Sequence, residues 1–148
     1  MEDHITFLTT SCARALYALR ILRSHGMKGC DLQTVFQATV ISKLQYASPA
    51  WWGFTNVSQK NRLESFLRRS IKAGFYSQTS ATFSRICEIA DKHFFTKVAS
   101  NNEHILHSLL PPKVVKYHDT RSTNSYSLPD KQNCLYEKNF FVRMIYDL

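Results

Sequence analysis

The chain has 148 residues, of which 44% are hydrophobic and 20% are charged, which is typical of one globular domain and unlike a disordered chain. Its four Gly and four Pro are few for an all-β domain built on tight turns, and no apolar run reaches the ~18 residues of a membrane span, so we expect no membrane association. The formal net charge of +8 predicts an affinity for polyanions, and residues 51–100 hold eight basic residues against three acidic ones.

The first predicted helix covers residues 5–22 and ends near Gly26, because glycine commonly terminates helices. Its apolar residues recur at steps of three and four, which places them in one stripe. The stripe consists of Ile5, Leu8, Cys12, Ala15, Leu19 and Leu22, and Leu16 widens it.

A second helix is predicted to begin at Asp31, whose side chain can cap it, and to end at Pro49, which lacks an N–H group. The aromatic linker that follows contains Trp51 and Trp52. These side chains could stack on bases. We favour a place in the core for both, since buried Trp commonly joins helix ends.

The third predicted helix carries the candidate binding residues. Asn56 or Ser58 can cap it, it runs to about Ala73, and Gly74 stops it. At 100° per residue its basic side chains lie opposite its apolar ones, and arginine offers a fork of donors that suits phosphate oxygens. The candidate nucleic-acid-binding residues are Lys60, Arg62, Arg68, Arg69 and Lys72. A solvated helix face is the alternative, and it carries equal weight.

A fourth helix is predicted over residues 81–100 with a core stripe of Phe83, Ile86, Cys87, Ala90, Phe94 and Val98, and Asn101 or Asn102 can cap a short fifth helix. Residues 113–134 are polar and predict an extended loop, and residues 140–146 predict a short strand or helix that packs back. We therefore expect an all-α fold, a small bundle of about four to five helices over residues 1–110, with an irregular extension over residues 111–148.

Catalytic chemistry finds little support in this sequence. The aspartates are scattered, whereas metal-dependent polymerases and nucleases need clustered carboxylates. His104 and His107 share a helical spacing, but two ligands alone predict ordinary histidines rather than a metal site. Cys12 and Cys87 lie on apolar stripes, which favours core packing. With no C-x-x-C pair, the four cysteines suggest reduced thiols in an intracellular protein, nuclear or cytoplasmic. We predict no enzyme activity, no cofactor and no metal.

Several segments, in order, resemble the region after the palm in reverse transcriptases of non-LTR (LINE-type, jockey-like) retrotransposons. The most distinctive is LQYASPAWWGF, followed by RLESFLRR and GF. The matching segments are residues 15–20, 44–54, 62–69, 74–75, 101–112, 117–121, 128–129 and 138–141.

The resemblance implies a helical thumb with a C-terminal extension that grips the template–primer duplex beside a catalytic palm. It implies that the catalytic aspartates belong to the palm, so that this chain is a non-catalytic fragment whose basic third helix contacts an RNA–DNA hybrid or duplex backbone. The apolar stripe of residues 5–22 is then expected to be partly exposed and to dock on a palm or another protein. A helical protein-interaction module and a degenerate, non-functional mobile-element remnant are the alternatives.

Overall fold

A computed structural model describes residues 1–77, 81–113, 126–128, 130 and 133–147, and within these ranges the predicted all-α class is confirmed. A single antiparallel bridge joins Lys113 and Tyr126. The elements in order are α1 (Glu2–Ser24), α2 (Gly29–Phe36), a π-helical turn η1 (Gln37–Ile41), α3 (Ser42–Gln45), α4 (Ser48–Trp51), a 3-10 turn η2 (Trp52–Phe54), α5 (Val57–Lys72), α6 (Phe83–Ser100), a 3-10 turn η3 (Ile105–Leu109), α7 (Cys134–Glu137) and α8 (Phe140–Tyr146). The polar residues 114–125, with the segment 117–121 of the resemblance, lie outside the described residues.

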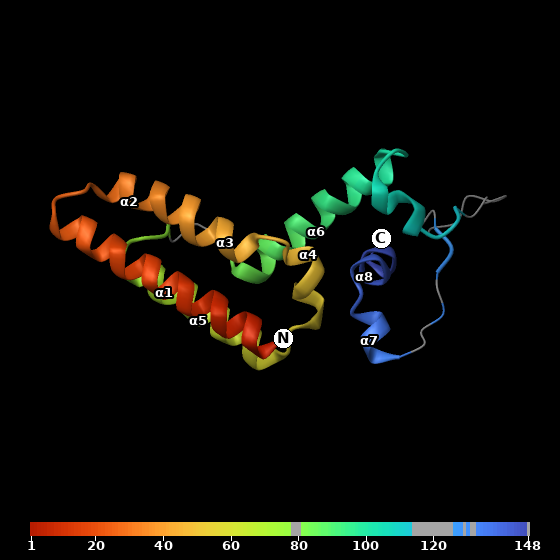
Figure 1. Cartoon of the computed structure of the whole chain (residues 1–148), viewed down its shortest axis with the longest axis horizontal. Helices are drawn as coiled ribbons and strands as arrows, with labels where there is room; N and C mark the ends of the chain where they lie inside the picture. Colours follow the sequence, from red (N-terminus) through yellow and green to blue (C-terminus); the bar gives the residue numbers. More distant parts are fainter. Residues whose placement is uncertain (78–80, 114–125, 129, 131–132, 148) are drawn as a thin grey trace.

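Helix α1 lies along one side of the molecule and shares that side with α5 (Figure 1). Its predicted stripe is buried at Ile5, Leu8, Cys12, Leu16 and Leu19, whereas Leu22 at its end is 37% exposed. The expected docking of this helix on a palm or another protein stays a prediction. Among the described residues, α1 is also long and apolar enough to cross a membrane, with a mean hydropathy of 1.2 over an 18-residue window. The apolar residues of α1 are interrupted by polar ones, so this property appears only when the hydropathy is averaged along the helix. In this fold 33% of that window is buried, on the side of the predicted stripe.

The second helix differs from the prediction at both ends. It begins at Gly29, so Asp31 lies within its first turn, where a carboxylate favours the helix dipole, and makes no side-chain cap. It continues through η1 into α3 and ends at Gln45, because Tyr46 leaves the helical conformation with a ψ of 124° and Ala47 then adopts a left-handed φ of 50°. Pro49 does not end this helix. It lies in the first turn of α4, where a missing N–H costs no hydrogen bond.

Helix α5 begins with a reciprocal capping box in which Asn56 Oδ1 accepts from Gln59 N at 2.8 Å and Gln59 Oε1 accepts from Asn56 N at 3.0 Å. It ends at Gly74, whose φ is +77°. Both features confirm the predicted boundaries. Helix α6 begins two residues later than predicted, at Phe83, because the Thr82 side chain caps it.

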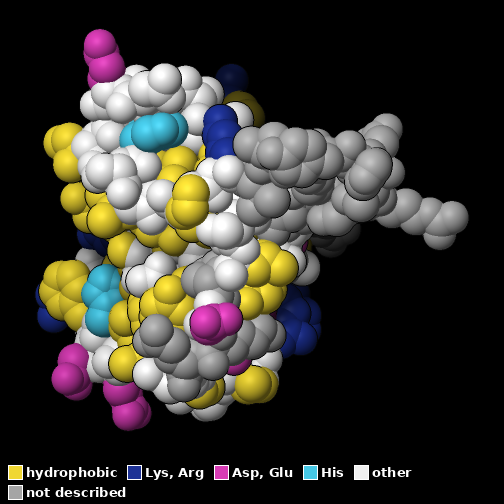
Figure 2. Space-filling model, turned by 90° about the vertical axis from the view of Figure 1, so that its right-hand side faces the viewer, with side chains coloured by type: hydrophobic (Ala, Val, Ile, Leu, Met, Phe, Trp, Pro, Cys, Tyr) yellow, Lys and Arg dark blue, Asp and Glu magenta, His cyan; other side chains and the backbone are white. Residues whose placement is uncertain are grey.

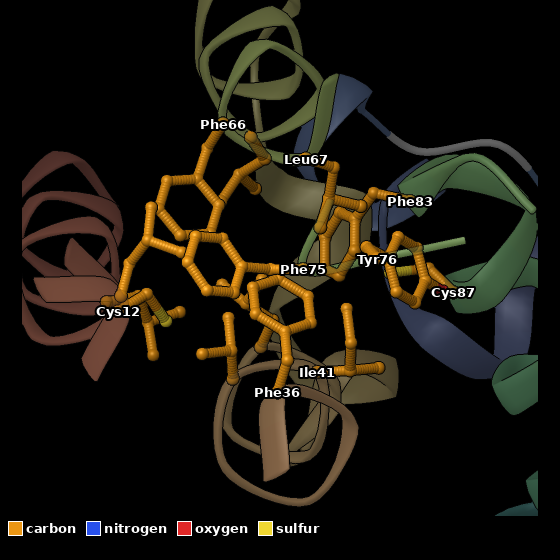
Figure 3. Close-up of a cluster of buried hydrophobic side chains, with 14 of the residues drawn as sticks. Cys12, Phe36, Ile41, Phe66, Leu67, Phe75, Tyr76, Phe83 and Cys87 are labelled. Atoms are coloured by element: carbon orange, nitrogen blue, oxygen red, sulfur yellow. The ribbon is translucent and has the colours of Figure 1, made fainter. Parts of the chain in front are cut away.

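The buried residues form two clusters that meet along α6. The larger cluster packs α1, α2–α4 and α5 around Phe75, which lies between Phe66 of α5 and Phe36 of α2 (Figure 3). The smaller cluster packs the C-terminal half of α6 against α8. Its buried members are Phe95, Tyr126, Phe140, Met144 and Ile145. The sequence suggested a change at residue 110, whereas the buried residues divide within α6.

Two close contacts dock α8 onto the rest of the chain. Arg143 Nη1 lies 3.0 Å from Asp91 Oδ2, and the Asp91 side chain is almost fully buried. Gly53 provides the second contact, since a Cβ atom there would overlap the Lys138 carbonyl oxygen and the Arg143 guanidinium. Asp91 is buried, although it was not among the core residues predicted for this helix. Phe94 was predicted to be buried, whereas Phe95 is the more buried of the two.

Candidate nucleic-acid interface

Helix α5 has one face inside the core and one face open to solvent. Leu63, Phe66, Leu67 and Ser70 are buried. Side chains on the opposite side line an open depression of about 490 Å³, and four of the five are cations. We call this set the cationic face: Arg62, Ser65, Arg68, Arg69 and Lys72.

The cations of this face are largely unpaired. Arg62 Nη1 donates to Thr6 Oγ1 of α1 at 3.2 Å, and Arg68 Nη2 donates to Ser65 Oγ at 3.3 Å. Both bonds are exposed, and neither partner is charged. In the part of the chain that the structure describes, none of the four cations forms an ion pair. None of these four cations therefore has a described carboxylate within the 4.0 Å of an ion pair.

The only carboxylate of α5 is directed away from the cationic face. Glu64 accepts from Ser84 N at 2.8 Å, from Ser84 Oγ at 2.9 Å and from Phe83 N at 3.2 Å. It thereby satisfies free N–H groups at the start of α6, where a negative charge is favourable. The spacing of residues within α5 could not predict this contact, since the partner helix begins 19 residues further on.

Lys60 does not join the other four predicted residues. Its Nζ lies 4.6 Å from the centroid of the Trp52 ring, over the buried aromatic linker. At 100° per residue, Lys60 lies 160° from Arg62, on the flank of α5 that faces α6. Its role in this structure is a cation–π contact.

Arg23 is a structural cation that the sequence analysis did not single out. Its Nη1 donates to the Ala73 carbonyl oxygen at 2.7 Å, and its guanidinium carbon lies 4.2 Å from the Phe75 ring centroid. A positive charge at the carbonyl end of a helix is favourable. Arg23 therefore fixes the end of α5 against α1 and helps to hold the cationic face in place.

The other candidates occupy structural places. Trp51 and Trp52 are buried in the larger cluster, as expected. His107 Nδ1 lies 2.8 Å from the Val98 carbonyl oxygen, and His104 Nδ1 accepts from Leu106 N at 3.1 Å. The described residues contain no group of three or more side chains suited to a metal ion.

The two buried cysteines are unreactive because of their apolar surroundings. Burial raises the pKa of Cys12 to about 11 and that of Cys87 to about 12. The thiolate is the reactive form of cysteine, so neither side chain is poised as a nucleophile near neutral pH. Both therefore act as small apolar core residues.

Comparisons with known proteins give no match. No family model matches the chain, and no curated protein or solved structure has significant similarity to it.

Proposed function

We propose that the chain binds the sugar–phosphate backbone of nucleic acid through the cationic face, as the thumb region of a retrotransposon reverse transcriptase without catalytic chemistry of its own. The order of segments that resemble this family supports the proposal. So does an all-α fold in which the matching residues 62–69 lie on α5 and include three cations of the cationic face.

The single observation that carries the proposal is the set of four cations without charged partners on one face of a helix whose other face is locked in the core. Arginine and lysine contacts to phosphate supply most of the affinity of sequence-independent binding. A helix fixed by a capping box, by Glu64 and by Arg23 presents these cations with little loss of order on binding.

The test measures binding of an RNA–DNA hybrid by fluorescence anisotropy. The variant R62A/R68A/R69A removes three cations of the cationic face. A matched control, K28A/K92A/K97A, removes the same charge from exposed positions outside it. We expect the first variant to lose at least about tenfold in affinity, since backbone contacts dominate such binding, and the control to lose much less.

Equal losses in the two variants would show that net charge alone attracts the hybrid, and the proposal would fail. The hybrid sequence provides a further check. Phosphate contacts do not read bases, so two unrelated hybrids should bind with equal affinity.

A protein-interaction module is the second candidate function, and one apolar groove favours it. The groove has a volume of about 260 Å³ and lies between η3 and α8. Hydrophobic side chains gather on this end of the molecule (Figure 2). The lining residues are Pro49, Ala50, Phe54, Phe94, Leu106, Leu109, Asn139, Phe140 and Phe141.

We infer that the occupant in this case is a second copy of the chain. Ile105 is 89% exposed and adjoins the groove residue Leu106, so two copies that meet at this end would both bury Ile105 and the groove. Sedimentation equilibrium tests this candidate. The wild type should dimerise and I105D should stay monomeric, whereas a monomeric wild type would exclude it.

A further inference from the structure

The exposed rim of α1 lies beside the cationic face. Two contacts show that α1 and α5 run in the same direction: Thr6 meets Arg62 near the start of both helices, and Arg23 meets Ala73 near their ends. The two helices thus lie side by side as one layer (Figure 1). Side chains of both helices contribute to its outer surface, since Thr6 of α1 contacts Arg62 of α5 at an exposed position.

Helical periodicity shows which α1 residues share this outer surface. Thr6 marks the rim, because it is exposed and bonded to Arg62. Eleven residues further on, a rotation of 1100° returns to within 20° of the same direction, so Tyr17 lies in the Thr6 row. The rise of about 1.5 Å per residue places Tyr17 roughly 16 Å along the helix, near the level of Arg69 and Lys72.

Tyr17 is a large aromatic side chain that the fold leaves open. It is 65% exposed, and no described hydrogen bond or ring contact involves it. Arg20 lies three residues further along the same rim and is also exposed, without an ion pair among the described residues. The outer layer therefore presents an aromatic ring between cations of two helices.

From this juxtaposition we propose that the α1–α5 layer binds single-stranded nucleic acid, with Tyr17 stacking on an unpaired base while Arg20 and the cationic face hold the phosphates. This inference rests on the proposed function, since it extends the same surface. An aromatic ring beside backbone-binding cations is the arrangement that single-strand-binding proteins use. Bases inside a duplex are already stacked and cannot use such a ring, whereas the cations serve both kinds of ligand.

The charges of the layer favour a polyanion over an apolar protein surface. Arg14, Arg20, Arg62, Arg69 and Lys72 all lie in α1 or α5 and are exposed. Desolvating so many unpaired cations against an apolar partner would be costly, whereas phosphates satisfy them.

The experiment compares oligo(dT), oligo(U) and a duplex of equal phosphate number, using fluorescence anisotropy with wild type, Y17A, Y17F and R62A/R68A/R69A. Y46A is the matched control, because Tyr46 is 80% exposed and lies just after α3. Since stacking contributes about 1–3 kcal/mol per base, Y17A should lose about fivefold or more on both single strands and little on the duplex. Y17F and Y46A should bind like wild type.

Each of the other outcomes contradicts either the stacking of Tyr17 or the binding of nucleic acid by this surface. If Y17A binds the single strands like wild type, or loses as much on the duplex, the stacking inference is wrong and the backbone proposal stands. If R62A/R68A/R69A binds every ligand like wild type, the proposed function itself fails. If wild type binds anionic phospholipid vesicles in preference to oligo(dT) and oligo(U), the surface is a membrane-binding one and the inference is overturned.

Discussion

The two hydrophobic clusters differ in how they are held together. The larger cluster draws buried residues from α1, α2–α4, α5 and the start of α6, and packs Phe36, Phe66 and Phe75 at its centre. The smaller cluster has fewer buried members among the described residues and is tied to the larger one by the Asp91–Arg143 ion pair and by Gly53. The comparison shows that the larger cluster forms from helix faces with regularly spaced apolar residues. The position of the smaller cluster depends instead on specific close contacts.

Truncating one buried aromatic ring in each cluster should give the largest difference in stability between the two regions. Phe36→Ala leaves a cavity at a fully buried position and should lower the free energy of unfolding by about 3–5 kcal/mol. Phe140→Ala should instead loosen α8 locally. Urea unfolding followed by the fluorescence of the buried Trp51 and Trp52, with hydrogen exchange in α8, distinguishes the two effects. A Phe140→Ala variant whose Trp transition shifts as far as that of Phe36→Ala would mean that the clusters unfold as one unit.

Substitution of Gly53, which lies close to the start of α8, should give the next largest loss of stability. In Gly53→Ala the new Cβ atom would overlap the Lys138 carbonyl oxygen, and backbone cannot move away as easily as a flexible side chain. We expect a loss of about 1–3 kcal/mol, the usual cost of overpacking, together with faster hydrogen exchange in α8. Gly29→Ala is the control, since nothing lies within 4 Å of its Cβ position. If both variants melt like wild type, the contact at Gly53 does not hold α8.

The reaction rates of the four cysteines report which thiols lie inside the larger cluster and which lie on the surface. Cys30 and Cys134 are exposed and should react quickly with a thiol reagent at pH 7.5, whereas Cys12 and Cys87 should react only on unfolding. The raised pKa values of the buried thiols, about 11 and 12, mean that the folded state keeps these protons above pH 9, where unfolded thiols lose them. The free energy of unfolding should therefore fall as pH rises above about 9. Rapid labelling of all four thiols in the native protein would contradict the buried placement.

The smallest effect that we expect is the pH dependence of stability that comes from Asp91, the acid of the ion pair between the clusters. Burial raises the pKa of Asp91 above its ordinary value of 3.8, although Arg143 opposes the shift. The folded state then holds a proton that the unfolded state has released, so this group contributes less stability as pH rises above about 4. Asp91→Asn should remove that part of the pH dependence. Parallel unfolding curves for wild type and variant at pH 4, 5, 6 and 7, with a constant difference, would show that Asp91 does not titrate in this way.

The helices of the larger cluster could be predicted well from the sequence. The helical spacing of Ile5 to Leu19 and of Leu63 to Leu67 identified buried faces, and Asn56 and Gly74 identified the ends of α5. These signals are local, since each depends on residues within a few turns of one helix. For the same reason the four cations Arg62, Arg68, Arg69 and Lys72 could be assigned to one exposed face.

Features that depend on distant contacts could not be predicted in this way. The docking of Glu64 on α6, the burial of Asp91 against Arg143 and the turn of Lys60 towards Trp52 each join residues from different elements. The turn between α3 and α4 places Ala47 at a left-handed φ that alanine rarely adopts, so the residue type gave no warning of this turn. Tyr17 had no special place in the sequence, and the stacking role that we propose for it depends on the parallel packing of α1 and α5.

The salt dependence of hybrid binding tests the central claim, that the cationic face binds the nucleic-acid backbone, most directly. Plotting log K against log salt concentration for wild type and for R62A/R68A/R69A gives two slopes. Each phosphate neutralised contributes about −0.9 to the slope, so the variant should be shallower by roughly 2 to 3 if its three arginines each contact a phosphate. Two parallel lines would contradict the account, because they would show that these arginines release no counterions on binding.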